Sequence, residues 1–114
     1  MAIDKSLLTG STTMLILKLL EEADMYGYQM IEELNKKSKN VFELKAGTLY
    51  PLLHTLEQKE LVTSYDQTAD NARVRKYYSI TKKGHKYLRD KKEEWKTFIS
   101  AVNDVLGGAN YATA

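Results

Sequence analysis

The chain contains a single proline, Pro51, which falls inside a stripe of leucines that otherwise predicts an uninterrupted helix. The leucines recur at the spacing of one buried helical face, at positions 49, 52, 53 and 56. A proline in a helix interior costs about 3 kcal/mol, whereas in the first turn its missing N–H has no partner to lose. Pro51 therefore predicts that this helix begins only a few residues earlier, near Gly47 or Thr48.

The expected start of the Pro51 helix is rich in small, hydroxylated, aromatic and basic residues, namely Lys45, Ala46, Gly47, Thr48 and Tyr50. At a helix start the backbone N–H groups lack partners within the helix, and the helix dipole is positive. Such an end attracts phosphate groups. The segment therefore suits contact with a nucleic-acid backbone.

The segments around the Pro51 helix predict a compact order of elements. Apolar residues with helical spacing predict helices over residues 12–22 and 26–37, the second with Tyr28, Ile31 and Leu34 on one side. Residues 61–65 and 73–81 are β-prone, and the polar residues 66–72 between them predict a flexible hairpin loop. Three helices followed by a hairpin is the order of a winged helix-turn-helix domain.

The second hairpin strand alternates between two kinds of side chain. Val74, Tyr78 and Ile80 share one side and are expected in the core, and Lys76 on the same side should lie beyond the core, near the hairpin tip. Arg73 and Arg75 occupy the other side. Near a hairpin tip, Arg73, Arg75 and Lys76 can reach phosphates or the minor groove.

A last helix is predicted over residues 82–106, with Thr81 as its N-cap and Gly107-Gly108 as its stop. Its apolar residues form a seam of the coiled-coil kind, at Leu88, Trp95, Phe98, Ile99, Val102, Val105 and Leu106. A monomer would leave this seam exposed, so homodimerisation through the last helix is the simplest interpretation. The alternative is a helix that folds back on its own domain.

Basic residues gather in one stretch, although the net charge of the whole chain is only +2. Residues 73–92 hold nine lysines and arginines and one aspartate, so this stretch carries +8 and the remainder −6. Such asymmetry is typical of a protein with one nucleic-acid face. A solvated helix surface can look the same, so the charge favours nucleic acid only together with the other features.

Two motifs carry a resemblance to a known family. GTLYPLLHTLEQKELV at residues 47–62 is followed by RKYYSITKKG at residues 75–84, and in this order they resemble the PadR-like transcriptional regulators. The resemblance covers roughly residues 6–106. It implies a mainly α fold with a small β-hairpin: a winged helix-turn-helix DNA-binding domain over residues 1–81, a C-terminal dimerisation helix over 82–108 and a tail over 109–114. In the family, the hairpin forms the wing, and a glycine often comes directly before its arginine. Here Asn71-Ala72 precedes Arg73, and Asn71 is expected to supply the positive φ.

The resemblance also implies a function, that of a dimeric repressor bound to a pseudo-palindromic site in double-stranded DNA. The expected DNA-binding residues are Lys45, Gly47, Thr48, Tyr50, His54, Arg73, Arg75 and Lys76. Tyr50 either gives its hydroxyl to a phosphate or packs on the second helix. His54 is interpreted as an exposed polar residue and not as a metal ligand.

Trp95 is the only tryptophan, midway along the last helix. The resemblance implies that it lines a site between subunits for a planar aromatic effector, together with Phe98, Ile99 and Val102. The alternative is an aromatic side chain that only fills the dimer interface.

Other function classes find little support in the sequence. There is no cysteine, and the two histidines and absent glycine-rich phosphate loop leave no basis for an enzyme, a metal site or a cofactor. No apolar run approaches the roughly 20 residues that span a bilayer, so the expected location is cytoplasmic, without a membrane partner. The alternative function is a winged-helix module that binds protein and not DNA.

Overall fold

The computed structural model describes residues 10–108. They form the elements α2 (Thr12–Glu22), β1 (Met25–Tyr26), α3 (Gly27–Lys37), α4 (Ala46–Gln58), β2 (Val62–Thr68), β3 (Val74–Ile80) and α5 (Lys82–Leu106). The tail predicted for residues 109–114 lies outside the described residues.

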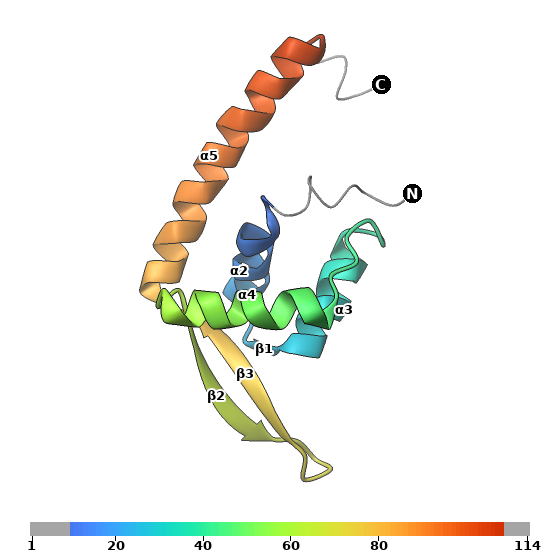
Figure 1. The fold of residues 1–114 in the computed structure, drawn as a ribbon, viewed down its shortest axis with the longest axis vertical. Coiled ribbons are helices and arrows are strands. Elements are labelled where there is room, and N and C mark those ends of the chain that lie inside the picture. The colour runs from blue at the N-terminus through green and yellow to red at the C-terminus, as the bar shows by residue number, and fades with distance from the viewer. Residues whose placement is uncertain (1–9, 109–114) are drawn as a thin grey trace.

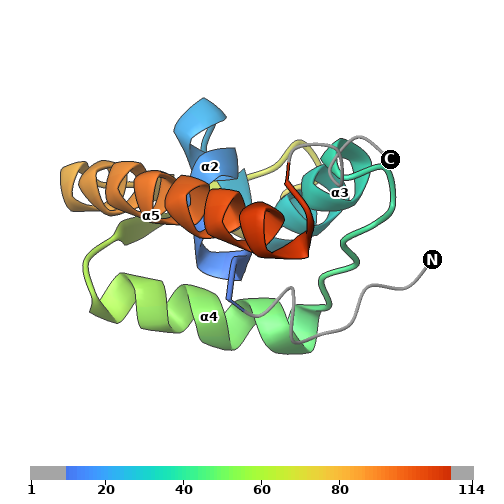
Figure 2. The same cartoon turned by 90° about the horizontal axis from the view of Figure 1, so that it is seen from above.

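Three helices form the body, and two elements project from it. In Figure 1 the β2–β3 hairpin extends away from one side of α2, α3 and α4, and α5 rises from the other side. Figure 2 shows α4 along one side of the molecule, with α2 and α3 beyond it. All four helices contribute fully buried side chains to one core, including Ile16, Leu17, Met30, Leu49, Leu53, Leu56 and Leu88. The predicted mainly α fold with a small hairpin is confirmed.

The leucine stripe of α4 faces this core, as its period predicts. Leu49, Leu53 and Leu56 are buried, and Leu52 is half-buried at the edge. The helix begins at Ala46, however, which places Pro51 in the second turn and not in the first. The carbonyl that loses its helical partner is that of Gly47, an exposed residue, so water can hydrogen-bond it.

The start of α3 differs from the prediction. Met25 and Tyr26 form a strand where the sequence predicts a polar break and the first helical residue. The buried side of α3 consists of Gly27, Met30 and Leu34. Tyr28 is 61% exposed, so its predicted place beside Leu34 is wrong: Met30 and Leu34, four residues apart, set the buried face instead.

The hairpin is longer and its loop shorter than predicted. β2 and β3 pair antiparallel from Val62 opposite Ile80 to Thr68 opposite Val74, which leaves only residues 69–73 between the strands. β1 pairs with the other side of β3, and the strand order is β1-β3-β2. Val74 is 60% exposed and outside the core, contrary to the prediction, because this part of the hairpin extends beyond the helices.

The turn at the hairpin tip uses a different residue from the one predicted. Ala72, not Asn71, adopts the positive φ of 64°. Asn71 instead accepts a hydrogen bond through Oδ1 from the Arg73 N–H at 3.1 Å. An asparagine side chain readily holds its own backbone in this way two residues on. The left-handed conformation at Ala72 costs roughly 1–2 kcal/mol.

The last helix begins and ends as predicted. Thr81 caps α5, and its Oγ1 accepts a hydrogen bond from the Gly84 N–H at 2.9 Å. Gly84 packs so closely on the Leu61 carbonyl that any Cβ would overlap it. This close approach anchors the first turn of α5 at the start of β2.

One carboxylate joins α2 to the first half of α5. Glu21 lies 3.0 Å from Lys18 Nζ, 3.5 Å from His85 Nδ1 and 3.8 Å from Lys92 Nζ. The hydrogen bond from Lys18, and then the charges of Lys18 and Lys92, lower the pKa of Glu21. The projecting helix is thus fixed to the body both by buried Leu88 and by this charge cluster.

Candidate nucleic-acid interface

The predicted contact residues of α4 line its exposed side. Lys45 is the N-cap residue of α4 and is exposed. Gly47, Thr48 and His54 are exposed as well. A Cβ built on Gly47 meets nothing within 4 Å, so the backbone is open to close approach at this point.

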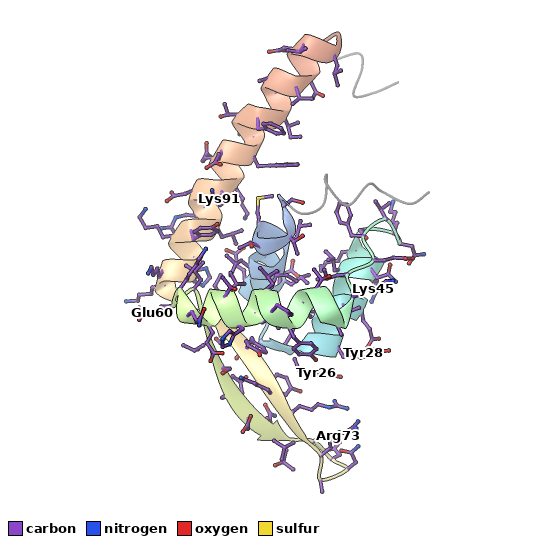
Figure 3. All side chains as sticks on the ribbon, in the orientation of Figure 1. Tyr26, Tyr28, Lys45, Glu60, Arg73 and Lys91 are labelled. Carbon is purple, nitrogen blue, oxygen red and sulfur yellow. The ribbon has the colours of Figure 1, made fainter. Side chains whose placement is uncertain are left out.

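A cleft of about 730 Å³ separates the start of α3 and α4 from the hairpin. Figure 3 shows Tyr26 and Tyr28 near the start of α3, with Lys45 at one end of α4 and Arg73 at the hairpin tip. Tyrosines from α4 and from the start of α3 line the side toward the body, called the aromatic wall, and the basic residues of the hairpin line the other side, called the basic wall. The lining residues are Tyr26, Gly27, Tyr28, Tyr50, Arg73, Val74, Arg75, Lys76 and Tyr78.

The cleft brings Tyr50 together with all three predicted basic residues of the hairpin, although they are more than twenty positions away in the sequence. Lys45, Gly47, Thr48 and His54 do not line it; they lie exposed on α4 beside it. The predicted residues therefore form two adjoining surfaces, the exposed side of α4 and the basic wall of the cleft.

Tyr50 packs on α3, which is one of the two roles that the sequence leaves open, and its exposed surface keeps the other role available. Its ring lies over the backbone of Gly27, where an added Cβ would be only 2.7 Å from Cζ. The side chain is nevertheless 49% exposed, and it lines the cleft. Gly27 has no side chain to push the ring away, so the tyrosine packs on α3 while it remains open to a ligand.

The three basic residues of the hairpin have different surroundings. Arg73 is exposed at the tip. The Arg75 guanidinium lies over the Tyr26 ring, with Cζ 4.5 Å from the ring centroid. Lys76 faces α4, where its Nζ is 3.8 Å from Glu57 Oε1. That carboxylate also accepts a hydrogen bond from Ser64 at 2.6 Å, so Glu57 ties α4 to both strands.

Sequence reasoning missed Tyr26 and Tyr28 as cleft residues. The sequence feature that could have indicated them is the pair of tyrosines on either side of Gly27. Both were assigned to the predicted helix over residues 26–37 because of its apolar spacing. Only the pairing of β1 with β3 brings Tyr26 next to Arg75. Burial raises the pKa of Tyr78, the buried tyrosine among the residues that line the cleft.

A second, more apolar groove of about 410 Å³ runs between α2 and α5. Trp95 and Phe98 line it with their rings 5.8 Å apart, together with Met14 and Tyr87. Ile99 and Val102, which the sequence places with Trp95, are half-buried on α5 and do not line this groove. Trp95 is 40% exposed and Phe98 is 56% exposed.

These features are those of a winged helix-turn-helix regulator: three packed helices, a hairpin beside the last of them, and a basic and aromatic cleft between the two. The model of the transcriptional regulator PadR-like family matches residues 16–90. The chain therefore belongs to the PadR-like family, whose members are transcriptional regulators and not enzymes.

Solved structures and a sequence relative agree with this assignment. A transcriptional regulator from Clostridium thermocellum is 32% identical, with a TM-score of 0.82 over 90% of this chain and 96% of that one. A PadR-like transcriptional regulator from Bacillus cereus is 30% identical, with a TM-score of 0.79 over 90% and 98% of the two chains. Transcriptional regulator Rv3488 of Mycobacterium tuberculosis is 30% identical over 84% of this chain and 83% of its own length.

The described part of the chain lacks a metal-binding cluster and a membrane-spanning helix. Residues 10–108 contain no group of three or more histidine or acidic side chains that could hold a metal ion. None of the helices in that range is both long and apolar enough to cross a membrane.

The packing of Tyr50 on Gly27 generates a prediction. Gly27→Ala places a methyl group where the tyrosine ring lies, so the ring must move within the cleft. We expect weaker binding of the cleft's ligand with little loss of stability, because the exposed ring can rotate outward. Affinity for duplex DNA and the urea midpoint of unfolding measure the two effects. For the urea midpoint alone, Gly47→Ala is the control, because it also replaces a helical glycine by alanine but fills open space.

Proposed function

We propose that the chain is a dimeric DNA-binding repressor that contacts DNA through α4 and the β2–β3 hairpin. The observation that carries this proposal is the cleft between Tyr50 on α4 and the basic strand β3. Arg73, Arg75 and Lys76 contribute positive charge to the lining of this cleft, and the exposed side of α4 begins with Lys45. Phosphate contacts of this kind provide most of the affinity of such proteins for DNA.

The two surfaces suit different parts of a duplex. In a helix-turn-helix, residues near the start of the recognition helix enter the major groove. Gly47 allows close approach of the α4 backbone there, and Thr48 and His54 can reach base edges or phosphates. The hairpin then lies along the neighbouring backbone, where Arg73 at the tip can reach phosphates or the minor groove. Residues 12–81 accordingly form the DNA-binding unit of the proposal.

Salt dependence tests the DNA-binding part. Because each neutralised phosphate releases counterions, the affinity for a labelled duplex should fall steeply as salt rises. Arg73→Ala should weaken binding about evenly across sequences and reduce the salt slope by about one. Lys91→Ala removes an equal charge from α5, far from the hairpin in Figure 3, and should leave the slope unchanged.

A different result would favour the alternative function. Binding that does not respond to salt, or a slope that Arg73→Ala leaves unaltered, would contradict the hairpin assignment. Absence of binding to any duplex would favour a winged-helix module that binds protein. The acidic balance of the chain outside residues 73–92 is compatible with that alternative.

The exposed seam of α5 supports the dimer. The C-terminal part of α5 extends away from the other helices (Figure 1), and the apolar residues Phe98, Val105 and Leu106 are all at least half exposed. An apolar stripe of this size marks an interaction surface, and a second copy offers the same stripe in return. A dimer places two recognition helices on one face, so the expected DNA site is pseudo-palindromic.

Sedimentation tests the dimer. We expect the chain to sediment as a dimer at micromolar concentration. The double variant Phe98→Glu with Val105→Glu should be a folded monomer, because both glutamates lie on the same side of α5 and place negative charge in the apolar seam. Lys96→Glu, an exposed change elsewhere on the same helix, is the control. A wild-type chain that is monomeric at this concentration would contradict the proposal.

The groove at Trp95 supports an effector. It combines an exposed indole with the Phe98 ring and the Tyr87 side chain, a set that suits a planar aromatic compound. The two charged residues of the lining, Lys91 and Glu94, pair with each other at 3.3 Å. An effector held here lies beside both α2 and α5, so it can favour one spacing of the two DNA-binding units over another. It then lowers the DNA affinity only by its preference for the unsuitable spacing.

Trp95 reports directly on this groove. A planar cationic dye that stacks on the indole should quench its fluorescence in a saturable way, and Phe98→Ala should weaken the dye's affinity. Unchanged fluorescence at high micromolar dye would leave Trp95 only as a residue that fills the dimer interface.

A further inference from the structure

Arg75 is held on the surface of the hairpin without an acidic partner. Its guanidinium carbon is 4.5 Å from the centroid of the Tyr26 ring. Among residues 10–108, no carboxylate lies within ion-pair distance of it, whereas Lys76 on the other side of the strand has Glu57. Arg75 is therefore positioned by an aromatic face, and its charge is not neutralised.

The strand register explains why these two side chains meet. Tyr26 of β1 is directly opposite Tyr77 of β3, and Arg75 precedes Tyr77 by two residues. Residues two apart on a strand share a face, so Arg75 is the diagonal neighbour of Tyr26. Because β1 pairs with β3 only at Tyr77 and Tyr78, the Tyr26 ring is the last part of β1 that the arginine can pack on.

The Tyr26 ring is itself fixed by a row of aromatic contacts. It meets Tyr77 edge-on at 5.4 Å, and Tyr77 stacks on Tyr65 of β2 at 5.8 Å. The Tyr65 hydroxyl donates a hydrogen bond to Asp24 Oδ2 at 2.7 Å, and Asp24 immediately precedes β1. The row thus begins and ends on the same short segment, and it ties the hairpin to the start of α3.

We propose that Tyr26 is a positioning residue that holds Arg75 ready for a DNA phosphate, an inference that rests on the proposed DNA binding. A guanidinium that lies over a ring keeps its N–H groups in the plane of the group, where they remain free to donate to phosphate oxygens. Arg75 lines the cleft beside Tyr50, so the phosphate it meets is one that flanks the α4 contact.

The two arginines of the hairpin should contribute differently to DNA binding. Arg73 is exposed at the tip, and no aromatic ring among residues 10–108 lies beneath its guanidinium, so it must lose its side-chain freedom when it binds. Arg75 has already lost much of that freedom in the free protein. We therefore expect Arg75→Ala to weaken DNA binding more than Arg73→Ala does, although both remove one charge.

A double-mutant cycle tests the role of Tyr26. The probe is a fluorescently labelled duplex of mixed sequence, long enough for two half-sites, and binding is measured by anisotropy at low salt. We expect Tyr26→Leu to weaken binding about three-fold, the size of an exposed cation–π contact. The same change should have no further effect when Arg75 is already alanine. Tyr26→Phe keeps the ring and should restore wild-type affinity.

Tyr28 provides the matched control. Its ring also lines the cleft, but Arg75 does not stack on it. Any loss from Tyr28→Leu should therefore be the same whether residue 75 is arginine or alanine. Equal losses from Tyr26→Leu in the two backgrounds, or a Tyr26→Phe variant as weak as Tyr26→Leu, would overturn the proposal.

A measurement on the wild-type chain covers the case in which Tyr26→Leu does not fold. The Tyr26 ring should shift the side-chain NMR signals of Arg75 away from those of Arg73, and the two arginines should differ in mobility. Identical, averaged signals would overturn the positioning role. If the wild type shows no salt-dependent DNA binding, the proposed function and this inference both fail. If it binds DNA but the effects of Tyr26→Leu and Arg75→Ala are independent, only this inference fails.

Discussion

The burial of one side of α4 is the interaction on which the rest of the molecule depends. Leu49, Leu53 and Leu56 enter the core, each contributing about 1.5–3 kcal/mol. Since their positions fix the rotation of the helix about its axis, they also fix which residues remain outside. Thr48, Tyr50 and His54 are exposed for this reason, and Tyr50 meets Gly27 at the edge of the same contact.

The remaining elements place charge around this helix. Glu57 near the end of α4 holds Ser64 and Lys76, so the hairpin cannot turn freely against the helix. The row from Asp24 through Tyr65 and Tyr77 to Tyr26 holds it from the other side. Glu21 and Leu88 join α5 to α2, which connects the Trp95 groove to the body.

Local signals in the sequence were sufficient for much of this fold. The leucine period, the Thr81 cap and the two glycines after Leu106 each determine a helix by contacts within a few residues, and α5 has the predicted bounds. The wrong predictions mostly concern residues whose conformation depends on segments far away in the sequence. β1 is a strand only because β3 lies beside it, and Tyr28 is exposed because the core takes Met30 and Leu34 instead. At the tip, Asn71 uses its side chain as an acceptor, so the strained conformation passes to Ala72. The residues of the basic wall could be named from the sequence, but the aromatic wall and the pairing of Arg75 with Tyr26 could not.

Amide chemical shifts of the isotope-labelled chain, followed during titration with duplex DNA, show directly whether α4 and the hairpin are the surfaces that bind the duplex. We expect the shifts to concentrate in the first turns of α4, at residues 26–28 and at residues 73–76, while the second half of α5 changes little. Shifts confined to α5, or an unchanged cleft in a chain that binds the duplex, would contradict this expectation.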